Sequence, residues 1–528
     1  MASGNSGNYH RRYSKAVSCR TACRTCSGGE CASVGYGNRM SLGKKTVQGV
    51  FWNYLSFGSG KLLAFVSTII LAALLVPEQF GQVAVALVVI QYLEAIGDLG
   101  ISAALIYQRD NIERASSVAF AISIAMGVVL TTLAALSAPL IGAFFSSPAS
   151  VPMVQVLALT LLINSFGQTQ MALLTKELKF RQKILPDLSR SLVKGFASIA
   201  LALLGFGAWS LIWGQVLGSI AITVVLWLVS SWRPRLIWDW ILASQMLKYG
   251  LQILWVELLA VIWTTADYII VGRLLGSADL GLYQQAFRIT DLLIINVCFV
   301  AGRVLFPSYV KMNHSIEALQ RGFLTTMRYV VLITLPLSIG VCAVAPLFVG
   351  VFYVNSAWLA MIPALQLLAL RAGISTISFN SGHILKAVGR PSIITKLMAV
   401  KLSVLVVTVL ITVQYGFVGV AFGQVGVALF SVALDCLTMR RIIQVSLASI
   451  WQQIWSALLA AAGMGVAVWL IVANTPPLWQ LPGLVVATFA GIVCYGAMLW
   501  LTNRELCMSS FHTLRQMLWP KQSAIVKY

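Results

Sequence analysis

Charged side chains inside otherwise apolar segments are the residues of this sequence most able to perform chemistry. Lys61 lies near the middle of one apolar segment and Arg371 near the middle of another, and neither has an opposite charge within one turn of its own segment. Because a charge at the centre of a bilayer costs about 2.5–3.5 kcal/mol on insertion scales, such residues usually face protein or water. We therefore predict that Lys61 and Arg371 line an internal cavity, where their charges would suit a phosphate or pyrophosphate.

Two further arginines share their segments with carboxylates. Arg273 follows Asp267 in the outer part of one segment, and Arg288 stands three residues before Asp291 in the next. Residues three or four apart lie on the same face of a helix, so the second pair is close enough for an ion pair. For these groups the sequence leaves two interpretations open, an internal ion pair or a place in the cavity wall.

A polar stripe marks another segment. Gln91, Glu94 and Asp98 are spaced i, i+3 and i+7, which places them on one helical face. That face must point into protein or water rather than into lipid, and Glu94 is a candidate partner for Lys61. The carboxylates that we consider for ion coupling or internal pairing are Glu94, Asp98, Asp267 and Asp291.

Four cysteines crowd into the first 39 residues of the chain, at Cys19, Cys23, Cys26 and Cys31. Their C-x3-C-x2-C spacing is similar to a spacing that holds iron–sulfur clusters, so a metal site is one interpretation. We favour a disordered basic extension, because this stretch is polar and carries no apolar run that could build a fold around the cysteines. We expect the working protein to begin at Met40.

The elements that position these residues must be membrane-spanning helices. Of the 528 residues 59% are hydrophobic and only 10% are charged, and the mean hydropathy is +0.86. Since soluble proteins carry about 25% charged residues, this composition indicates a polytopic membrane protein. The charges that give the net value of +21 lie mostly between the apolar segments, so they favour membrane lipids and an anionic substrate over nucleic acid.

We predict an all-α fold with about fourteen transmembrane helices. The expected spans, judged against a hydrocarbon core about 30 Å thick, are 48–75, 81–107, 116–138, 153–174, 185–204, 209–231, 248–273, 281–306, 327–350, 358–382, 396–414, 418–438, 452–473 and 483–501. Lys and Arg occur in every second connection, whereas the connections between these carry neither. Positive charge marks the cytoplasmic side, so we predict that both termini are cytoplasmic.

The apolar segments form a duplicated set. Leu74–Gly81 aligns without gaps on Leu274–Gly281, and Gly207–Val216 aligns on Gly416–Val425. The matches are offset by 200 and 209 residues and keep the same order, which indicates six duplicated helices. An even number of helices gives both copies one orientation, so we predict two parallel six-helix lobes around a central cavity. The predicted regions are the extension at 1–39, lobes at 40–241 and 242–446, and two additional helices with a cytoplasmic tail at 447–528.

Residues typical of soluble enzymes form no recognisable constellation. The sequence contains no phosphate-binding loop, and its four histidines are widely separated. A membrane glycosyltransferase usually carries charged residues on a large outer loop, whereas the longest predicted outer connection, Pro139–Pro152, has none. We therefore predict a protein that is not an enzyme and needs no cofactor, with the glycosyltransferase as a distant alternative.

A family resemblance is carried by three stretches of the sequence. The three stretches are LAALLVPEQFGQVAVA, GDLGISAALIYQRD and ADYIIVGRLLGSADLGLYQQAFRITDL. In them the chain resembles bacterial polysaccharide flippases, which belong to the multidrug/oligosaccharidyl-lipid/polysaccharide exporter superfamily. The resemblance implies paired lobes that alternate between inward-open and outward-open states. It also implies transfer of an undecaprenyl-pyrophosphate-linked oligosaccharide repeat unit across the inner membrane.

The resemblance also implies roles for individual residues. The candidates to hold the pyrophosphate or acidic sugars are Lys61, Arg273, Arg288 and Arg371. Asp267 and Arg273 match the family's Asp…Gly-Arg pattern. The implied coupling ion is H+ or Na+, and the candidate coupling carboxylates are Glu94, Asp98 and Asp291.

The sequence as a whole predicts an inner-membrane flippase that supplies exopolysaccharide or O-antigen (lipopolysaccharide) biosynthesis. Its expected partners are a lipid-linked oligosaccharide, membrane lipids and a polysaccharide polymerase or export machinery. A cation-coupled multidrug exporter and a lipid II flippase are the transport alternatives. Drug exporters favour organic cations and so need carboxylates in the cavity, whereas Lys61 and Arg371 suit anions.

Overall fold

The structure is a computed structural model that describes residues 58, 60–61, 63–177, 179–235, 237–476, 479–502 and 504. These residues belong to one compact unit, Gly49–Tyr528. The N-terminal cysteines and Met40 lie outside the described residues, so what the sequence predicts for them stays a prediction.

Helices make up all of the regular structure within the described ranges. After a helical segment at Leu63–Leu74, they are α2 (Pro77–Asp98), α3 (Ile101–Tyr107), α4 (Ile112–Phe144), α5 (Ser150–Lys176), α6 (Phe180–Leu203), α7 (Ala208–Val229), α8 (Trp240–Leu274), α9 (Ser277–Thr290), η2 (Asp291–Ile295), α10 (Asn296–Met312), α11 (Ile316–Phe352), η3 (Ser356–Met361), α12 (Ile362–Thr376), α13 (Ser381–Ala387), α14 (Pro391–Thr412), η4 (Val413–Tyr415), α15 (Gly416–Ile443), α16 (Leu447–Ala473) and α17 (Gln480–Thr502). In this part of the chain, ten helical segments are long and apolar enough to cross a membrane. The prediction of an all-α membrane protein is confirmed, whereas the count of fourteen crossings stays a prediction.

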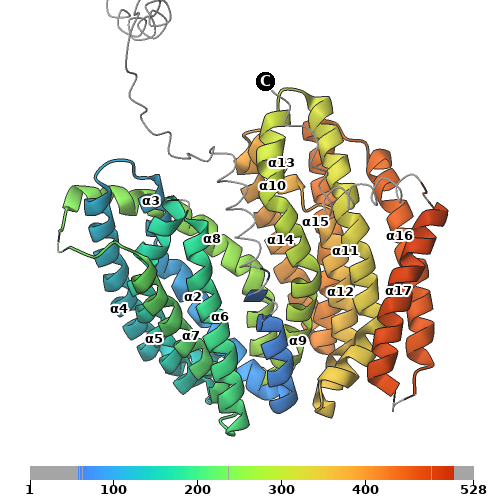
Figure 1. The fold of residues 1–528 in the computed structure, drawn as a ribbon, viewed down its shortest axis with the longest axis horizontal. Helices are drawn as coiled ribbons and strands as arrows, with labels where there is room; N and C mark the ends of the chain where they lie inside the picture. The colour runs from blue at the N-terminus through green and yellow to red at the C-terminus, as the bar shows by residue number, and fades with distance from the viewer. Residues whose placement is uncertain are drawn as a thin grey trace, which may run out of the picture. The chain divides into compact units, whose positions relative to one another are not determined.

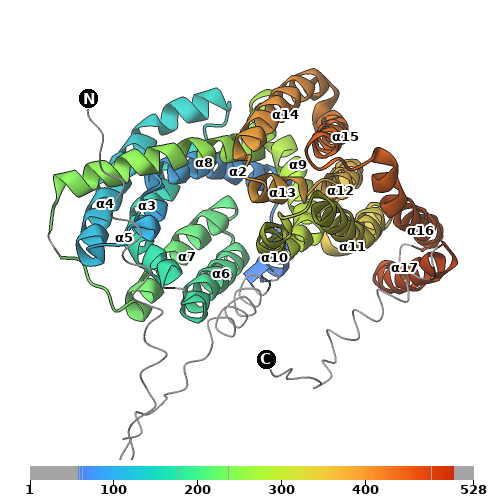
Figure 2. The same cartoon turned by 90° about the horizontal axis from the view of Figure 1, so that it is seen from above.

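Helices that are close in the chain mostly pack side by side. α4, α5, α6 and α7 pack together, and α11 packs against α12, α16 and α17 (Figures 1 and 2). α8 is an exception, because this long helix contacts α2, α3 and α4 as well as α9 and α14. It therefore connects the N-terminal half of the chain to the C-terminal half along its length (Figure 2).

The start of α2 differs from the sequence prediction. The expected spans 48–75 and 81–107 leave residues 76–80 in a connection, but Pro77 is the first residue of the helix. Proline suits a first helical turn because its ring fixes φ and its missing N–H would have no helical partner there. The backbone N–H of Val76 donates to the Gln79 side chain at 3.2 Å, which caps this end of the helix.

The expected span 81–107 is one apolar segment but two helices. Leu99 and Gly100, with φ angles of 44° and 64°, separate α2 from α3. A side chain at Gly100 would collide with the backbone of Gly250 in α8, so the bend lets two backbones touch. Hydrophobic periodicity cannot signal this break, because the residues on both sides remain apolar.

Equivalent glycines of the internal repeat contact each other. Gly81 in α2 lies against the backbone of Ser277, and Gly281 in α9 lies against the backbone of Pro77. A methyl group at either glycine would collide with the opposing carbonyl oxygen, so this crossing requires glycine on both sides. The sequence offset of 200 relates the two glycines and also relates Pro77 to Ser277. A reciprocal contact of this kind is typical of two copies related by a two-fold axis.

Trp358 joins the beginning of α2 to the C-terminal half. Its side chain is fully buried, and its indole N–H donates to the backbone carbonyl of Leu75 at 3.2 Å. Its ring packs edge-on against Phe80, with the ring centroids 5.3 Å apart. These residues belong to one hydrophobic core that includes residues of both halves of the chain.

Candidate functional site

Four cations face the same internal space. Two adjoining hollows of about 440 and 610 Å³, which we call the cationic cavity, share wall residues that include Lys61, Arg190, Lys194 and Arg288. Lys61 precedes α2, Arg190 and Lys194 belong to α6, and Arg288 belongs to α9. Both hollows fall in the range of about 300–1,000 Å³ that is usual for ligand sites.

Positive charge exceeds negative charge in these walls. Lys183 is the fifth cation of the cationic cavity, and the carboxylates are Glu94, Asp187 and Asp291. Arg288 is exposed to this space, although its neighbours Phe287 and Ile289 are buried. A low-dielectric wall focuses the field of an excess charge, so the cationic cavity is suited to an anionic ligand.

The cationic face of α6 was missed in part by the sequence analysis. Helix α6 carries four charged residues at intervals of four, three and four positions, namely Lys183, Asp187, Arg190 and Lys194. Such intervals keep side chains on one side of an α-helix. We placed Lys183 in a connection, but α6 begins at Phe180 and includes it. We did not select Arg190 as a site residue, and the regular spacing of these charges is the signal that could have identified it.

Asp291 forms an ion pair with Arg371 in α12. Arg371 Nη1 lies 3.5 Å from Asp291 Oδ1, and the guanidinium lies 4.2 Å from the centroid of the Phe287 ring. Asp291 and Phe287 are wall residues of the cationic cavity, whereas Arg371 is not among the wall residues. The opposite charge that Arg371 lacks on its own helix therefore comes from another helix, and its role in substrate binding stays a prediction.

Asp267 is buried where three helices meet. Its Oδ2 accepts hydrogen bonds from the Tyr283 hydroxyl at 2.7 Å and from Gln424 Nε2 at 2.9 Å. Its Oδ1 accepts from the backbone N–H of Tyr268 at 3.0 Å. These bonds tie α8 to α9 and α15, so the geometry favours internal pairing over ion coupling as the role of Asp267.

Arg273 contacts the end of α4. Its Nη1 donates to the Ser146 hydroxyl at 3.1 Å, and its guanidinium lies 5.3 Å from the centroid of the Phe144 ring. Arg273 is not among the wall residues of the cationic cavity. The predicted contact between Arg273 and pyrophosphate thus has no support from this geometry and stays a prediction.

Glu94 and Asp98 point into the protein, in agreement with the polar stripe that we described. Glu94 Oε1 accepts from Asn164 Nδ2 at 3.1 Å. Asp98 Oδ1 accepts from the Ser102 hydroxyl at 2.6 Å and from the Gln168 side chain. The amide donors both come from α5, so one face of α5 fixes the carboxylates of α2.

An ion pair within the C-terminal half has no signal in the local sequence. Lys401 Nζ in α14 lies 2.6 Å from Asp435 Oδ1 in α15, and the two side chains are 17% and 9% exposed. The two residues lie 34 positions apart, so helical spacing cannot reveal the pair. Since each charge is neutralised by the other, we assign this pair a structural role.

An apolar cavity of about 670 Å³ lies mainly among α11, α16 and α17. Its polar wall residues are Thr488 and Tyr495, whose hydroxyls donate to the backbone carbonyls of Leu484 and Leu332. Because these hydroxyls are already bonded, the cavity presents a hydrocarbon surface. Ile289 lies in the walls of both this cavity and the cationic cavity, so the two adjoin.

Comparison with known families and relatives places this geometry in context. Residues 70–363, more than half of the 528-residue chain, match the family described as polysaccharide biosynthesis protein. The succinoglycan biosynthesis transport protein ExoT of Rhizobium meliloti (strain 1021) is 29% identical over 355 residues, which cover 66% of this chain and 71% of that protein. The teichuronic acid biosynthesis protein TuaB of Bacillus subtilis (strain 168) is 26% identical over 462 residues, which cover 86% and 95%. These matches confirm the family resemblance of the sequence motifs.

Solved structures show the same fold. The lipid II flippase MurJ, in an inward closed conformation, matches with a TM-score of 0.73 and 14% identity, over 86% of this chain and 99% of that one. An inward-facing multidrug resistance MATE family transporter of the MOP superfamily matches with a TM-score of 0.58 and 16% identity, over 73% and 94%. At such low identity the likeness concerns the fold alone.

Proposed function

We propose a function from the premise that this chain belongs to the polysaccharide biosynthesis protein family. The chain acts as a flippase that moves a lipid-linked oligosaccharide repeat unit across the bacterial inner membrane for exopolysaccharide or O-antigen biosynthesis. The observation that carries this proposal is the cationic cavity, in which cations from α6, α9 and the segment before α2 face one space.

The cations of this cavity hold the pyrophosphate that links lipid to sugar. Arg190 and Arg288 present planar guanidinium groups, which bind phosphate oxygens through two parallel hydrogen bonds. Lys61 and Lys194 add compact charges that compensate the remaining negative charge of the ligand. A cationic cargo would meet walls in which five cations outnumber three carboxylates, which argues against a multidrug exporter.

The apolar cavity receives part of the lipid chain. A prenyl chain has no polar atoms, so it gains free energy from an apolar wall and loses none through unpaired hydrogen-bonding groups. Ile289 is shared by the apolar and cationic cavities and follows Arg288 directly. We propose that one ligand, with a pyrophosphate joined to a hydrocarbon chain, extends from the cationic cavity past Ile289 into the apolar cavity.

The transport cycle alternates between inward-open and outward-open states of two six-helix lobes, at 40–241 and 242–446. The reciprocal contact between Gly81 and Gly281 supports two such copies, because equivalent residues meet there. The positive connections favour cytoplasmic termini, so a reporter at Ala208 or Ser356 should be accessible from the periplasm. H+ or Na+ is the proposed coupling ion.

The proposed function is tested by reconstitution into liposomes. Wild-type protein should move a fluorescent polyprenyl-pyrophosphate-linked sugar between leaflets, measured by chemical quenching of the outer leaflet. In a Lys61→Met and Arg288→Met double variant the rate should fall at least about tenfold, because two charge-assisted hydrogen-bonding groups are lost. Arg321→Met, which removes an exposed arginine near the start of α11, is the matched control and should leave the rate unchanged.

The outcomes separate the alternatives. Undiminished transport by the double variant, with the variant folded, would overturn the role of the cationic cavity. Transport of a fluorescent organic cation but not of the phosphorylated lipid would favour the multidrug exporter. Transport of lipid II in preference to other polyprenyl-pyrophosphate-linked sugars would favour the lipid II flippase.

A further inference from the structure

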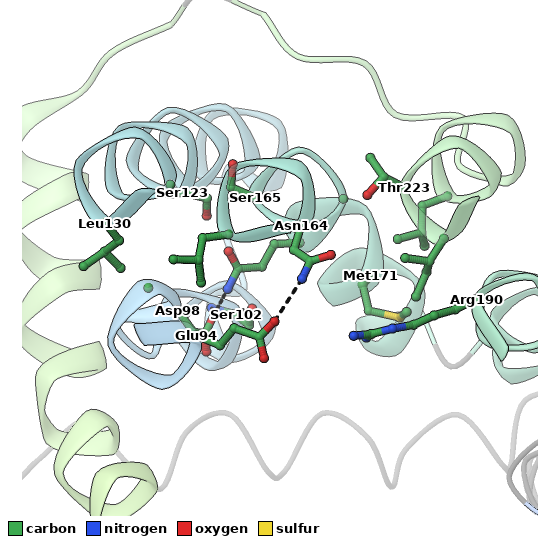
Figure 3. Close-up of a pocket in the computed structure, with 17 residues that line it drawn as sticks. Glu94, Asp98, Ser102, Ser123, Leu130, Asn164, Ser165, Met171, Arg190 and Thr223 are labelled. Carbon is green, nitrogen blue, oxygen red and sulfur yellow. Dashed lines mark hydrogen bonds between the residues drawn. The ribbon is translucent and has the colours of Figure 1, made fainter. Parts of the chain in front are cut away.

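A smaller polar cavity adjoins the cationic cavity. Its volume is about 300 Å³, and its walls come from α2, α3, α4, α5, α6 and α7 (Figure 3). Glu94 and Arg190 line both this polar cavity and the cationic cavity. In Figure 3 Arg190 extends from α6 toward Met171 in α5, at one side of the polar cavity. A ligand group in the polar cavity would therefore be next to a ligand group held by Arg190.

Among the described residues, the polar cavity has one cation in its walls, Arg190, whereas the cationic cavity has five. The hydroxyl and amide side chains of the polar cavity are Ser102, Ser123, Asn164, Ser165, Gln168 and Thr223. The hydroxyls of Ser102, Ser165 and Thr223 already donate within the protein, so they offer acceptor lone pairs to the hydroxyl groups of a sugar. Met171, Ile222 and Leu226 supply an apolar part of the wall, which suits the C–H face of a sugar ring. The combination of apolar surface with a few placed polar groups is typical of a small-molecule site.

The two carboxylates of the polar cavity are held in position with acceptor capacity to spare. Asn164 donates to Glu94 Oε1, as a dashed line of Figure 3 shows, and Gln168 donates to Asp98 Oδ1. Glu94 Oε2 and Asp98 Oδ2 accept no hydrogen bond from the part of the chain that the structure describes. Carboxylates fixed in this way can accept hydrogen bonds from neighbouring sugar hydroxyls with little loss of side-chain entropy.

The volume limits what the polar cavity can hold. At about 300 Å³ it lies at the lower end of the range for small-molecule sites, so it suits one sugar residue rather than a whole repeat unit. In a lipid-linked oligosaccharide the first sugar is bonded directly to the pyrophosphate. With the pyrophosphate at Arg190, Lys194 and Arg288, that first sugar is the ligand group nearest to the polar cavity.

We propose that the polar cavity binds the first sugar of the lipid-linked oligosaccharide and thereby selects which glycan is transported. This inference rests on the proposed function and names the part of the substrate that its site distinguishes. Asn164 and Gln168 are the specificity-determining residues, because they orient the carboxylates and lie in the wall themselves. The contribution of the pyrophosphate is separate, since the cations that bind it lie mainly in the cationic cavity.

The test measures binding of soluble short-chain ligands to the purified full-length protein. The probes are farnesyl pyrophosphate and its conjugates with glucose, galactose, N-acetylglucosamine or N-acetylgalactosamine. Wild-type protein should bind at least one conjugate about tenfold more tightly than farnesyl pyrophosphate, as expected for one to two additional hydrogen bonds. The Asn164→Leu and Gln168→Met double variant should lose this preference and keep its affinity for farnesyl pyrophosphate.

A matched control comes from the same helix. Gln155 in α5 is exposed and is not a wall residue of the polar cavity, so Gln155→Met should keep the preference. If the double variant does not fold, Thr223→Val replaces it, with Thr132→Val on exposed surface of α4 as its control. Thr223→Val should reduce the preference at least threefold, because the side-chain volume is kept while one hydroxyl is removed.

Each result has one meaning for the inference. Equal affinity of the wild type for farnesyl pyrophosphate and for all four conjugates would overturn the sugar site and leave the proposed function standing. A preference that persists in the folded variants would likewise overturn the assignment of the polar cavity. Failure of the wild type to bind any of the five probes would instead count against the proposed function itself.

Discussion

Helices α6 and α14 hold the same position in the two halves of the chain but use their cations differently. Arg190 lies ten residues after Phe180, the first residue of α6, and Lys401 lies ten residues after Pro391, the first residue of α14. Lys401 is paired with Asp435 at 2.6 Å. Arg190 lines the cationic cavity and forms no ion pair with the described residues. These two helices thus carry a structural cation in one half and a ligand-facing cation in the other.

The partner helix explains this difference. The repeat aligns Gly207–Val216 on Gly416–Val425. When this alignment is extended along α7 and α15, Leu226 aligns with Asp435. Leu226 is buried and lines the polar cavity near Arg190. Helix α15 therefore supplies a carboxylate to the cation of its neighbouring helix, whereas α7 has Leu226 at the aligned position.

The largest effect is expected where the structural pair is broken. Asp435→Leu gives α15 the residue that α7 has, and it leaves the charge of Lys401 buried without compensation. Breaking a buried pair in this way costs about 3–5 kcal/mol. We expect a marked fall in the thermal unfolding temperature of the purified protein in detergent. Adding Lys401→Met should restore most of the loss; an unchanged unfolding temperature in the single variant would mean that the pair has little structural role.

Where α2 crosses α9, equivalent substitutions in the two halves of the chain should destabilise the protein to a similar extent. Gly81→Ala and Gly281→Ala each place a methyl group against an opposing backbone, so each should destabilise the protein by about 1–3 kcal/mol. The double variant should lose less than the sum, since one displacement of the helices relieves both collisions. Thermal unfolding measures all three variants. Gly426→Ala in α15, where a methyl group meets no atom within 4 Å, is the control, and unequal losses at Gly81 and Gly281 would contradict the reciprocal crossing.

The reverse exchange tests the ligand-facing cation. Leu226→Asp gives α7 the carboxylate that α15 has, and it should neutralise Arg190 from within the N-terminal half. Leu226→Asn is the matched control, because it introduces a polar side chain of the same size without charge. We expect transport of the phosphorylated lipid to be about tenfold slower in the Asp variant than in the Asn variant, which corresponds to about 1.4 kcal/mol. Equal rates in liposomes would show that the charge of Arg190 is not used.

What the sequence could predict depends on whether the cause of a feature is local. Lys61 and Arg288 line the cationic cavity, and the sequence could single them out because a charge within an apolar segment is costly wherever its neighbours lie. Arg190 lies inside the expected span 185–204 and was missed because that span was judged by its apolar residues and not by the spacing of its charges. The partner of Arg371 could not be predicted, since Asp291 lies eighty residues earlier on another helix.

The fold, like the site, could be predicted only where the cause of a feature is local in the sequence. Apolar length predicted the helices, and the repeat predicted which glycines are equivalent, because both are properties of the printed residues. The break at Leu99 and Gly100 was not predicted, since its cause is the close approach of Gly250 from α8. The polar cavity could not be predicted from the sequence either, because its walls come from six helices that only tertiary packing brings together.

The smallest effect is expected at Arg371. This cation is paired with a carboxylate, as Lys401 is, but its partner Asp291 lines the cationic cavity. Its charge faces Asp291 at 3.5 Å, and the Asp291 side chain is 44% exposed, so the pair is only partly removed from solvent. Exposed pairs contribute about 0–1 kcal/mol, and the Phe287 ring adds a cation–π contact of similar size. We expect Arg371→Met to slow transport at most about threefold, whereas Arg190→Met should slow it at least tenfold. Both variants are compared in the same liposome assay at equal protein levels. If the two losses were equal, pairing with a carboxylate would not separate structural from ligand-facing cations, and the contrast between α6 and α14 would lose its functional meaning.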